Sequence, residues 1–190
     1  MKIGLFFGSF NPIHIGHLII ANHAIEYAAI DQLWFVISPH SPFKKKSTLA
    51  PDYDRLHLVQ IAIQEDPRLK ASSIEFSLPQ PSYTIDTLAY LKEKYPKNEF
   101  ALIMGSDNLK GLHKWKNYEI LIKEHPIYVY NRPGEINSRP YPDAQIEYLN
   151  GPLLHISASF IREQLKQEKS IRYLVHDTTY KYLSENKIYK

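Results

Sequence analysis

The chain has 190 residues, of which 44% are hydrophobic and 23% charged, which is typical of one globular domain with a sizeable core. It contains no cysteine, which excludes disulfides, thiolate metal sites and cysteine nucleophiles, and its net charge of +3 is too small to argue for a nucleic-acid partner. The sequence has neither a membrane-spanning apolar run nor a signal-peptide pattern, so we expect a cytoplasmic protein without membrane partners. We expect residues 1–190 to form a single domain with a C-terminal helical part over about 157–190.

The first predicted elements are a strand, a turn and a helix. Residues 3–7 form a short apolar run typical of a buried strand, a turn begins at Gly8, and residues 16–30 are helix-forming. This order places backbone N–H groups and a helix N-terminus where a phosphate can bind. His14 and His17 would face the same way there and could hydrogen-bond a phosphate that gains charge during a reaction. The alternative is a pair of structural surface histidines, which is the commoner outcome for an isolated H-x-x-H.

A second buried strand is predicted at residues 33–37, and its helical crossover from the first implies a parallel pair. Ligands bind beyond the carboxyl ends of such strands, so the first turn and the segment at 38–46 should share one cleft. That segment is basic, and Lys45 is its candidate phosphate contact. A solvated basic loop is the alternative for each of its lysines.

The middle of the chain alternates predicted helices and strands. We expect a helix at 51–64 with an apolar stripe at Leu56, Val59 and Ile63. Arg55, near its start, could organise the lysine loop or lie on the surface. A short strand is predicted at 73–76.

The next segments carry three candidate binding residues. Thr84 is predicted to be a helix N-cap, and this structural role would by itself explain a threonine at this position. A core strand at 100–104 runs into Gly105 and Asp107, and this carboxylate could cap the following helix or hold a ribose hydroxyl or a lysine. Trp115 lies among polar residues, where a flat ring can stack on a base.

The C-terminal part predicts a phosphate-binding turn. Strands are expected at residues 127–130, 146–149 and 153–156. Ser157 precedes a predicted helix at 159–167, whose start would offer N–H groups, the hydroxyl of Ser159 and the guanidinium of Arg162, one turn further on. Simple capping with a surface arginine is the alternative. Residues 170–190 are expected to form a final helix with tyrosines packing on the domain.

Two of these segments resemble the nucleotidyltransferase superfamily. The first reads Gly8-Ser9-Phe10-Asn11-Pro12-Ile13-His14-Ile15-Gly16-His17 and is similar to G-x-F-x-P-x-H-x-G-H. The last reads Ile156-Ser157-Ala158-Ser159-Phe160-Ile161-Arg162 and resembles I-S-S-T-x-I-R, with Ala158 in place of a serine. The resemblance implies an α/β fold, namely a Rossmann-like doubly wound parallel sheet in three α/β/α layers.

Within that superfamily the chain is similar to the nicotinate-nucleotide adenylyltransferases, on three further motifs. These are the basic loop with Lys45, the string Ser82-Tyr83-Thr84-x-Asp86-Thr87-Leu88, and Gly105-x-Asp107-x-Leu109 followed by Trp115. The resemblance implies transfer of the adenylyl group of ATP to nicotinate mononucleotide, giving deamido-NAD and pyrophosphate in NAD biosynthesis. Mg²⁺ would be held by the substrate phosphates and water, with no protein metal site.

The resemblance also implies residue roles. The implied catalytic residues are His14, His17, Lys45 and Arg162. The implied ATP-binding residues are Gly8, Ser9, Phe10, His14, Gly16, His17, Gly105, Asp107, Ile156, Ser157, Ser159 and Arg162. The residues implied for nicotinate mononucleotide are Ser9, Phe10, Lys45, Thr84, Asn108 and Trp115.

Other functions stay open from the sequence. Phosphopantetheine or nicotinamide mononucleotide could be the acceptor, and a phosphopantetheine adenylyltransferase would share the first motif. A cytidylyltransferase would show a different C-terminal phosphate-binding turn, rich in Arg and Thr. A nucleotide-binding sensor without catalysis is a further alternative, against which the presence of His14, His17 and Arg162 argues. The protein could be a monomer or a homo-oligomer.

Overall fold

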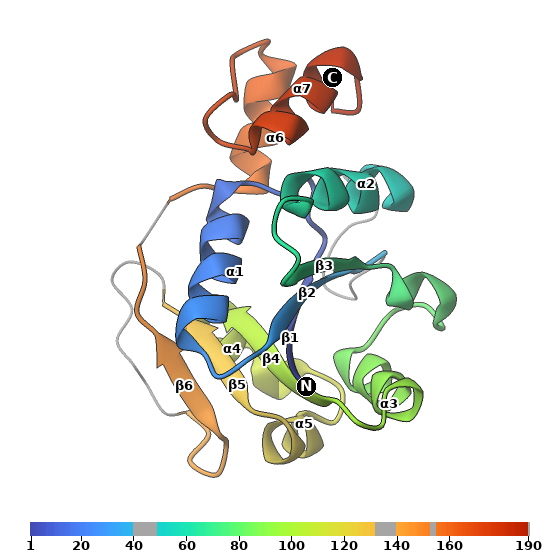
Figure 1. The fold of residues 1–190 in the computed structure, drawn as a ribbon, viewed down its shortest axis with the longest axis vertical. Helices are drawn as coiled ribbons and strands as arrows, with labels where there is room; N and C mark the ends of the chain where they lie inside the picture. The colour runs from blue at the N-terminus through green and yellow to red at the C-terminus, as the bar shows by residue number, and fades with distance from the viewer. Residues whose placement is uncertain (40–48, 132–139, 153–154, 190) are drawn as a thin grey trace.

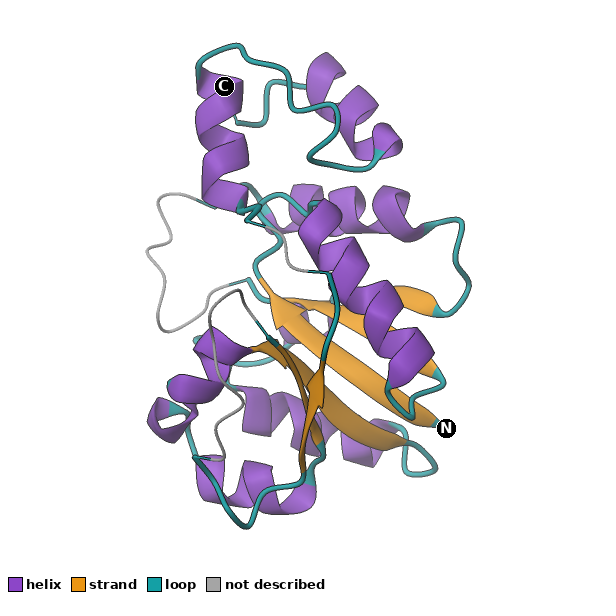
Figure 2. Cartoon of the chain, turned by 90° about the vertical axis from the view of Figure 1, so that its left-hand side faces the viewer, coloured by secondary structure: helices purple, strands orange, loops and turns teal. Residues whose placement is uncertain are grey.

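The computed structural model describes residues 1–39, 49–131, 140–152 and 155–189 and contains one parallel six-stranded sheet. The strand order is β3-β2-β1-β4-β5-β6, with every neighbouring pair parallel. The strands are β1 (Lys2–Gly8), β2 (Gln32–Ile37), β3 (Leu69–Ser72), β4 (Glu99–Gly105), β5 (Ile127–Tyr130) and β6 (Ile146–Leu149). Figure 2 shows the twist of this sheet and the helices that cover it.

Helices cover both faces of the sheet. They are α1 (Ile15–Tyr27), α2 (Asp52–Ile63), α3 (Thr84–Lys94), α4 (Ser106–Lys110), α5 (Tyr118–Glu124), α6 (Ala158–Lys166) and α7 (Asp177–Glu185), with 3₁₀ turns η2 (Ile74–Ser77) and η3 (Leu112–Lys114). Alternate strand residues face opposite ways, so Phe6 and Ile103 join a core with α1 and α2, whereas Leu5 and Leu102 join a core with α3, α4 and α5. The expected doubly wound three-layer α/β/α fold is confirmed.

The strand order reverses between β1 and β4. The chain proceeds from β1 outward through β2 to β3, then returns to β4 on the other side of β1 and proceeds through β5 to β6. Open α/β sheets bind ligands at such a switch point, beyond the carboxyl ends of the strands. The ends of β1 and β4 here are Gly8 and Gly105, two positions for which the resemblance implies contact with ATP.

The C-terminal helices lie together at one end of the molecule, next to α2 (Figure 1). The Thr178 hydroxyl donates to the Ile61 carbonyl of α2 at 2.7 Å. The ring of Tyr182 packs edge-on against the ring of His57, with 4.7 Å between the ring centroids. Leu183 is buried in the same core as α1 and α2. We therefore propose that residues 1–190 form one domain.

Three predicted elements are wrong in place or extent. The third strand is Leu69–Ser72, where the ladder with β2 runs, and residues 74–77 turn instead into η2. No strand includes His155 or Ile156, because the sheet ends at β6; Leu153 and Leu154 lie outside the described residues. The final helix covers only Asp177–Glu185, where the His176 ring accepts from the Thr178 N–H as its N-cap.

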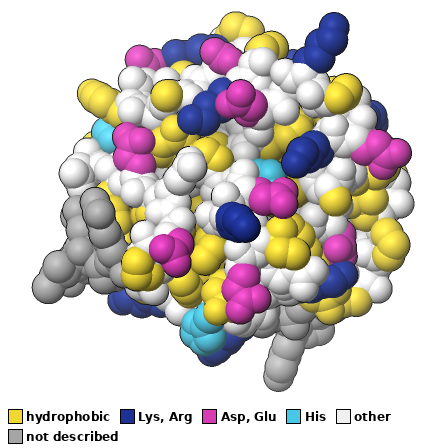
Figure 3. Space-filling model, turned by 90° about the horizontal axis from the view of Figure 1, so that it is seen from below, with side chains coloured by type: hydrophobic (Ala, Val, Ile, Leu, Met, Phe, Trp, Pro, Cys, Tyr) yellow, Lys and Arg dark blue, Asp and Glu magenta, His cyan; other side chains and the backbone are white. Residues whose placement is uncertain are grey.

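The surface carries charges of both signs. On the face drawn in Figure 3, Lys and Arg side chains are interspersed with Asp, Glu and apolar side chains. None of the helices in the described ranges is long and apolar enough to span a membrane.

One variant tests whether the C-terminal helices unfold with the sheet. Leu183→Ala removes a buried side chain from α7 and should lower the free energy of unfolding by about 2–5 kcal/mol. Both tryptophans, Trp34 and Trp115, lie outside the C-terminal helices, so their fluorescence reports on unfolding of the sheet and the helices around it. In urea titrations, fluorescence and far-UV circular dichroism should shift together; a transition seen by circular dichroism alone would separate the two parts. Tyr173→Ala, at a side chain 86% exposed, is the control and should change stability little.

Candidate active site

The turn after β1 is shaped by an aromatic side chain that folds back on the strand. Phe10 has a φ of +42°, in the left-handed region that side chains disfavour, and its ring is buried against Phe6 and Phe35. A Cβ at Gly8 would lie 2.8 Å from this ring, so only glycine fits there. The ring of Phe10 therefore supports the turn from the core, and only its backbone is placed to meet a ligand.

His14 and His17 form a stacked pair at the start of α1. Their ring centroids are 3.7 Å apart with an interplanar angle of 23°. His14 is the N-cap and His17 the third helical residue, so the helix begins two residues later than residue 13. The backbone N–H of His14 donates to Nδ1 of His17 at 3.2 Å, which in the neutral ring leaves the proton on Nε2. His17 thus offers a donor whose direction the backbone fixes.

The C-terminal motif meets this first motif directly. The Ser157 hydroxyl caps α6 by accepting from the Phe160 N–H at 3.2 Å. Arg162 donates from Nη1 to the Asn11 carbonyl at 2.7 Å and from Nη2 to the Ser159 hydroxyl at 3.2 Å. The predicted placement of Arg162 beside Ser159 is confirmed, and a contact across 151 residues of chain joins the two motifs.

Gly16 and Ile156 add a second contact between the same motifs. A Cβ at Gly16 would lie 3.1 Å from the His14 ring and 3.9 Å from Cβ of Ile156. The N–H of Ile15 donates to the Leu174 carbonyl at 2.9 Å, so the C-terminal segment takes one of the N-terminal donors of α1. A side chain at position 16 would therefore crowd the His14 ring, while its Cβ would be in ordinary contact with Ile156.

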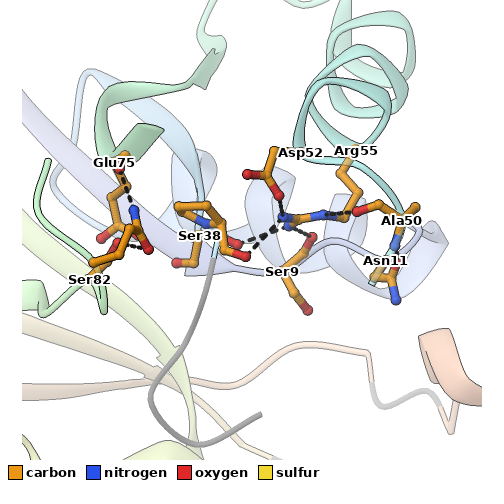
Figure 4. A network of polar contacts seen from close by, with 10 residues as sticks. Ser9, Asn11, Ser38, Ala50, Asp52, Arg55, Glu75 and Ser82 are labelled. Carbon is orange, nitrogen blue, oxygen red and sulfur yellow. Dashed lines mark hydrogen bonds and ion pairs between the residues drawn. The ribbon is translucent and has the colours of Figure 1, made fainter. Parts of the chain in front are cut away.

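A buried arginine holds the ends of β1 and β2, and Figure 4 shows its contacts. The Arg55 side chain has no exposed surface. Its Nη1 donates to the carbonyls of Ser9 at 2.6 Å and Ser38 at 2.9 Å, and its Nε donates to Ala50 at 3.1 Å. Its Nη2 pairs with Asp52 at 2.6 Å. This guanidinium therefore fixes the backbone just after β1 and β2 end.

Asn11 completes this support. Its side-chain Oδ1 accepts from the Ala50 N–H at 3.0 Å, while its carbonyl receives the bond from Arg162. The amide oxygen of Asn11 thus supplies the acceptor that this contact needs.

The segments with Thr84 and Trp115 lie side by side. Lys116 Nζ pairs with Asp86 at 2.8 Å and lies 4.9 Å from the centre of the Tyr83 ring. The N-cap of α3 is Tyr83 and Thr84 is the first helical residue, so the predicted capping by Thr84 is wrong. Trp115 is half-buried and packs against the core with α3 and α5, so it is in part a structural residue.

The loop after β4 begins with α4. Gly105 is its N-cap and Asp107 lies in its first turn, where a carboxylate is favoured by the helix dipole, so Asp107 is not the cap. A Cβ at Gly105 would lie 2.6 Å from Oδ1 of Asp107, which shows that this carboxylate folds back over the glycine. Asp107 and Asn108 are exposed at this edge of the sheet.

Lys45 falls outside the described residues, so its role stays a prediction. Asp107 and Asn108 follow the carboxyl end of β4 in the first turn of α4, Thr84 begins α3, and Trp115 follows η3. Within the described ranges, no group of three or more His, Asp or Glu side chains could hold a metal ion.

The sequence prediction left out the supporting residues. Arg55 was given equal chances of a structural and a surface role, although it is spaced i, i+3, i+4 and i+7 with Leu58, Val59 and Ala62, all buried. Leu56, which was placed on the stripe, is only half-buried. Asn11 and Ser38 showed no signal, because their role comes from contacts made after folding.

Comparison with known proteins gives the family. Residues 5–180 match the family model described as cytidylyltransferase-like. The chain is 53% identical over 192 residues to a Flavobacterium psychrophilum protein named "Probable nicotinate-nucleotide adenylyltransferase", with 100% of both chains covered. It is 50% identical to a Cytophaga hutchinsonii protein of the same name, with 100% of this chain and 98% of the relative covered.

A solved structure shares the fold. The Plasmodium falciparum nicotinic acid mononucleotide adenylyltransferase, complexed with NaAD, superposes with a TM-score of 0.84 at 24% identity and covers 99% of this chain and 97% of its own. The full-length relatives, together with the two motifs that Arg162 joins, establish that this chain belongs to the cytidylyltransferase-like family and, within it, to the nicotinate-nucleotide adenylyltransferases.

Proposed function

We propose that the protein transfers the adenylyl group of ATP to nicotinate mononucleotide, giving deamido-NAD and pyrophosphate. The observation that carries this proposal is the contact of Arg162 with the Asn11 carbonyl, in the turn that leads to the stacked His14–His17 pair. It gathers cationic and N–H donors at one end of a parallel sheet, as a triphosphate requires.

The reaction needs no protein nucleophile. A phosphate oxygen of nicotinate mononucleotide attacks the α-phosphorus of ATP in line, and a new P–O bond forms. The bond from that phosphorus to the oxygen bridging to the β-phosphate breaks, and pyrophosphate leaves with the electron pair. Catalysis therefore depends on positioning and on stabilising the charge that develops on phosphate oxygens.

We assign the donors around the triphosphate as follows. Nε2–H of His17 donates to a phosphate oxygen that gains charge as the bond breaks. The ring of His14 is stacked on that of His17 and supports its orientation. Arg162, with the hydroxyls of Ser157 and Ser159, holds the β- and γ-phosphates. Lys45 is proposed to join them.

Mg²⁺ is proposed to arrive with ATP. The groups assigned to the triphosphate are N–H, guanidinium and hydroxyl donors, whereas Mg²⁺ prefers oxygen ligands and keeps several waters. These residues fit an ion carried by substrate oxygens, where it would neutralise phosphate charge.

The acceptor is proposed to bind beside α3 and α4. Thr84 and Asn108 lie in the first turns of these helices, and the Trp115 ring is proposed to pack on the pyridine ring. The Lys116–Asp86 ion pair supports this placement because it holds the Trp115 segment against the start of α3.

Removal of the His17 imidazole tests the charge-stabilising role. His17→Ala should lower kcat about 10²–10³-fold, the usual cost of losing one donor to a developing charge. His23→Ala, in the same helix two turns further on, is the matched control and should stay within threefold. The measurement is pyrophosphate release with ATP and nicotinate mononucleotide, with circular dichroism to show that both variants fold. Near-normal turnover of His17→Ala would refute the assignment.

A charge-conserving change tests the geometry of Arg162. Arg162→Lys keeps the positive charge but cannot reach the Asn11 carbonyl and the Ser159 hydroxyl together. We expect kcat/KM for ATP to fall on the order of ten- to a hundredfold. The control is Arg172→Lys, an exposed arginine whose contacts are with tyrosine rings. If Arg162→Lys behaved like that control, a purely charge-based role would replace the one proposed.

The pyridine side is tested at Trp115. Trp115→Ala should raise KM for nicotinate mononucleotide roughly tenfold while leaving KM for ATP nearly unchanged, because a stacked ring contributes about 1 kcal/mol or more. Trp115→Phe should recover most of this loss. Initial rates with each substrate varied separately measure both constants. A rise in KM for ATP alone, with KM for nicotinate mononucleotide unchanged, would contradict the assignment.

A further inference from the structure

A buried carboxyl lies close to the proposed acceptor site but takes no part in the chemistry described so far. Glu75 belongs to η2 and is 1% exposed. Its Oε1 accepts from the Thr87 hydroxyl at 2.8 Å, and Thr87 is fully buried in the first turns of α3. Burial of a carboxyl is costly unless it is hydrogen-bonded, so its contact with Thr87 is central to its place in the fold.

The turn before α3 is held to Glu75 at both ends. Before the turn, Nε2 of Gln80 donates to the Glu75 carbonyl at 3.1 Å, and the Ser82 hydroxyl reaches Oε1 of Gln80 at 3.4 Å. After the turn, the Thr87 hydroxyl that meets Glu75 also lies 3.3 Å from the Tyr83 carbonyl. Residues 82–84 are therefore positioned by one side chain and its backbone.

Glu75 also connects this turn to the ATP side. Figure 4 shows Ser38 and Ser82 beside the Glu75 side chain. Ser38 follows β2 directly, and its N–H donates to the Gly8 carbonyl at 2.9 Å while its carbonyl accepts from Arg55 at 2.9 Å. A shift of Glu75 would move the turn relative to the ends of β1 and β2.

The Glu75 carboxyl is held by hydroxyl groups, without a charged partner. Burial raises the pKa of Glu75, and hydrogen bonding by the hydroxyls of Thr87, Ser38 and Ser82 opposes that shift only in part. Glu75 forms no ion pair with any residue that the structure describes. An amide of the same shape can therefore replace it.

We propose that Glu75 is a positioning residue for the acceptor substrate, which holds the Ser82–Thr84 turn against the end of β2 and so sets the affinity for nicotinate mononucleotide. This inference rests on the proposed function, because it assumes that Thr84 and its neighbours bind that substrate.

The test compares Glu75→Ala with Glu75→Gln. Glu75→Ala should raise KM for nicotinate mononucleotide about tenfold, as expected for the loss of a buried hydrogen bond, with kcat and KM for ATP within twofold of the original. Glu75→Gln keeps the shape and an acceptor for Thr87, and should restore KM to within twofold. Titration calorimetry of nicotinate mononucleotide should show the same pattern in the absence of turnover.

A second pair and a control separate positioning from stability. Thr87→Val removes the hydroxyl at constant shape and should repeat the rise in KM for nicotinate mononucleotide, whereas Thr87→Ser keeps the hydroxyl and should not. This pair tests the same contact if Glu75→Ala fails to fold. Leu91→Ala, a buried side chain further along α3, should lower stability without changing either KM. Equal increases in both KM values, an equal effect of Leu91→Ala, or failure of Glu75→Gln to recover would overturn the inference. If the unmodified protein formed no deamido-NAD from these substrates, the proposed function itself would fail instead.

Discussion

The buried guanidinium of Arg55 is the interaction on which the geometry of the site depends. Two parallel strands, β1 and β2, end side by side, and the carbonyls that follow them have no further strand to pair with. The Arg55 side chain donates hydrogen bonds to both of these carbonyls, at Ser9 and Ser38, and to a third at Ala50. Burial of a charge costs several kcal/mol and is tolerated only when its hydrogen bonds are made together. The loops that begin at these carbonyls therefore have one well-defined starting point.

A second arginine acts on the same turn from the other side. Arg55 binds the Ser9 carbonyl and Arg162 binds the Asn11 carbonyl, so Phe10, with its left-handed backbone, lies between two fixed points. A strained conformation persists where its surroundings over-determine it, and this one aims the following residues toward the helix that carries His14 and His17. The N-terminal motif is thus completed by a residue near the C-terminus, which explains why the chain needs the helices after the sheet.

The sequence predicted the parts of this structure that have a local pattern. The strands at 33–37, 100–104 and 127–130 were confirmed, because buried strands in a parallel sheet are continuous apolar runs. The strand at 146–149 was confirmed as well, at the edge of the sheet. The segment at 73–76 alternates polar and apolar residues, as a half-buried strand would, but the ladder with β2 uses 69–72, and register depends on the partner strand. For the site, the motifs predicted that Arg162 would lie beside Ser159, whereas the role of Arg55 depends on the carbonyls of Ser9 and Ser38, in other segments, which a local pattern does not reveal.

The two sides of the proposed site are built differently. The ATP side uses residues whose positions follow from short motifs and from strand ends at a switch point, so its geometry is tied to the sheet itself. The acceptor side is a turn and two helix starts that are held by side-chain contacts, Thr87 with Glu75 and Lys116 with Asp86. Contacts of this second kind can change without disturbing the sheet, which is how one fold can serve different acceptors. Ser38 belongs to both sides, since its backbone is fixed by Gly8 and Arg55 while its hydroxyl faces Glu75. With the substrates bound as proposed, their relative position is set at the end of β2.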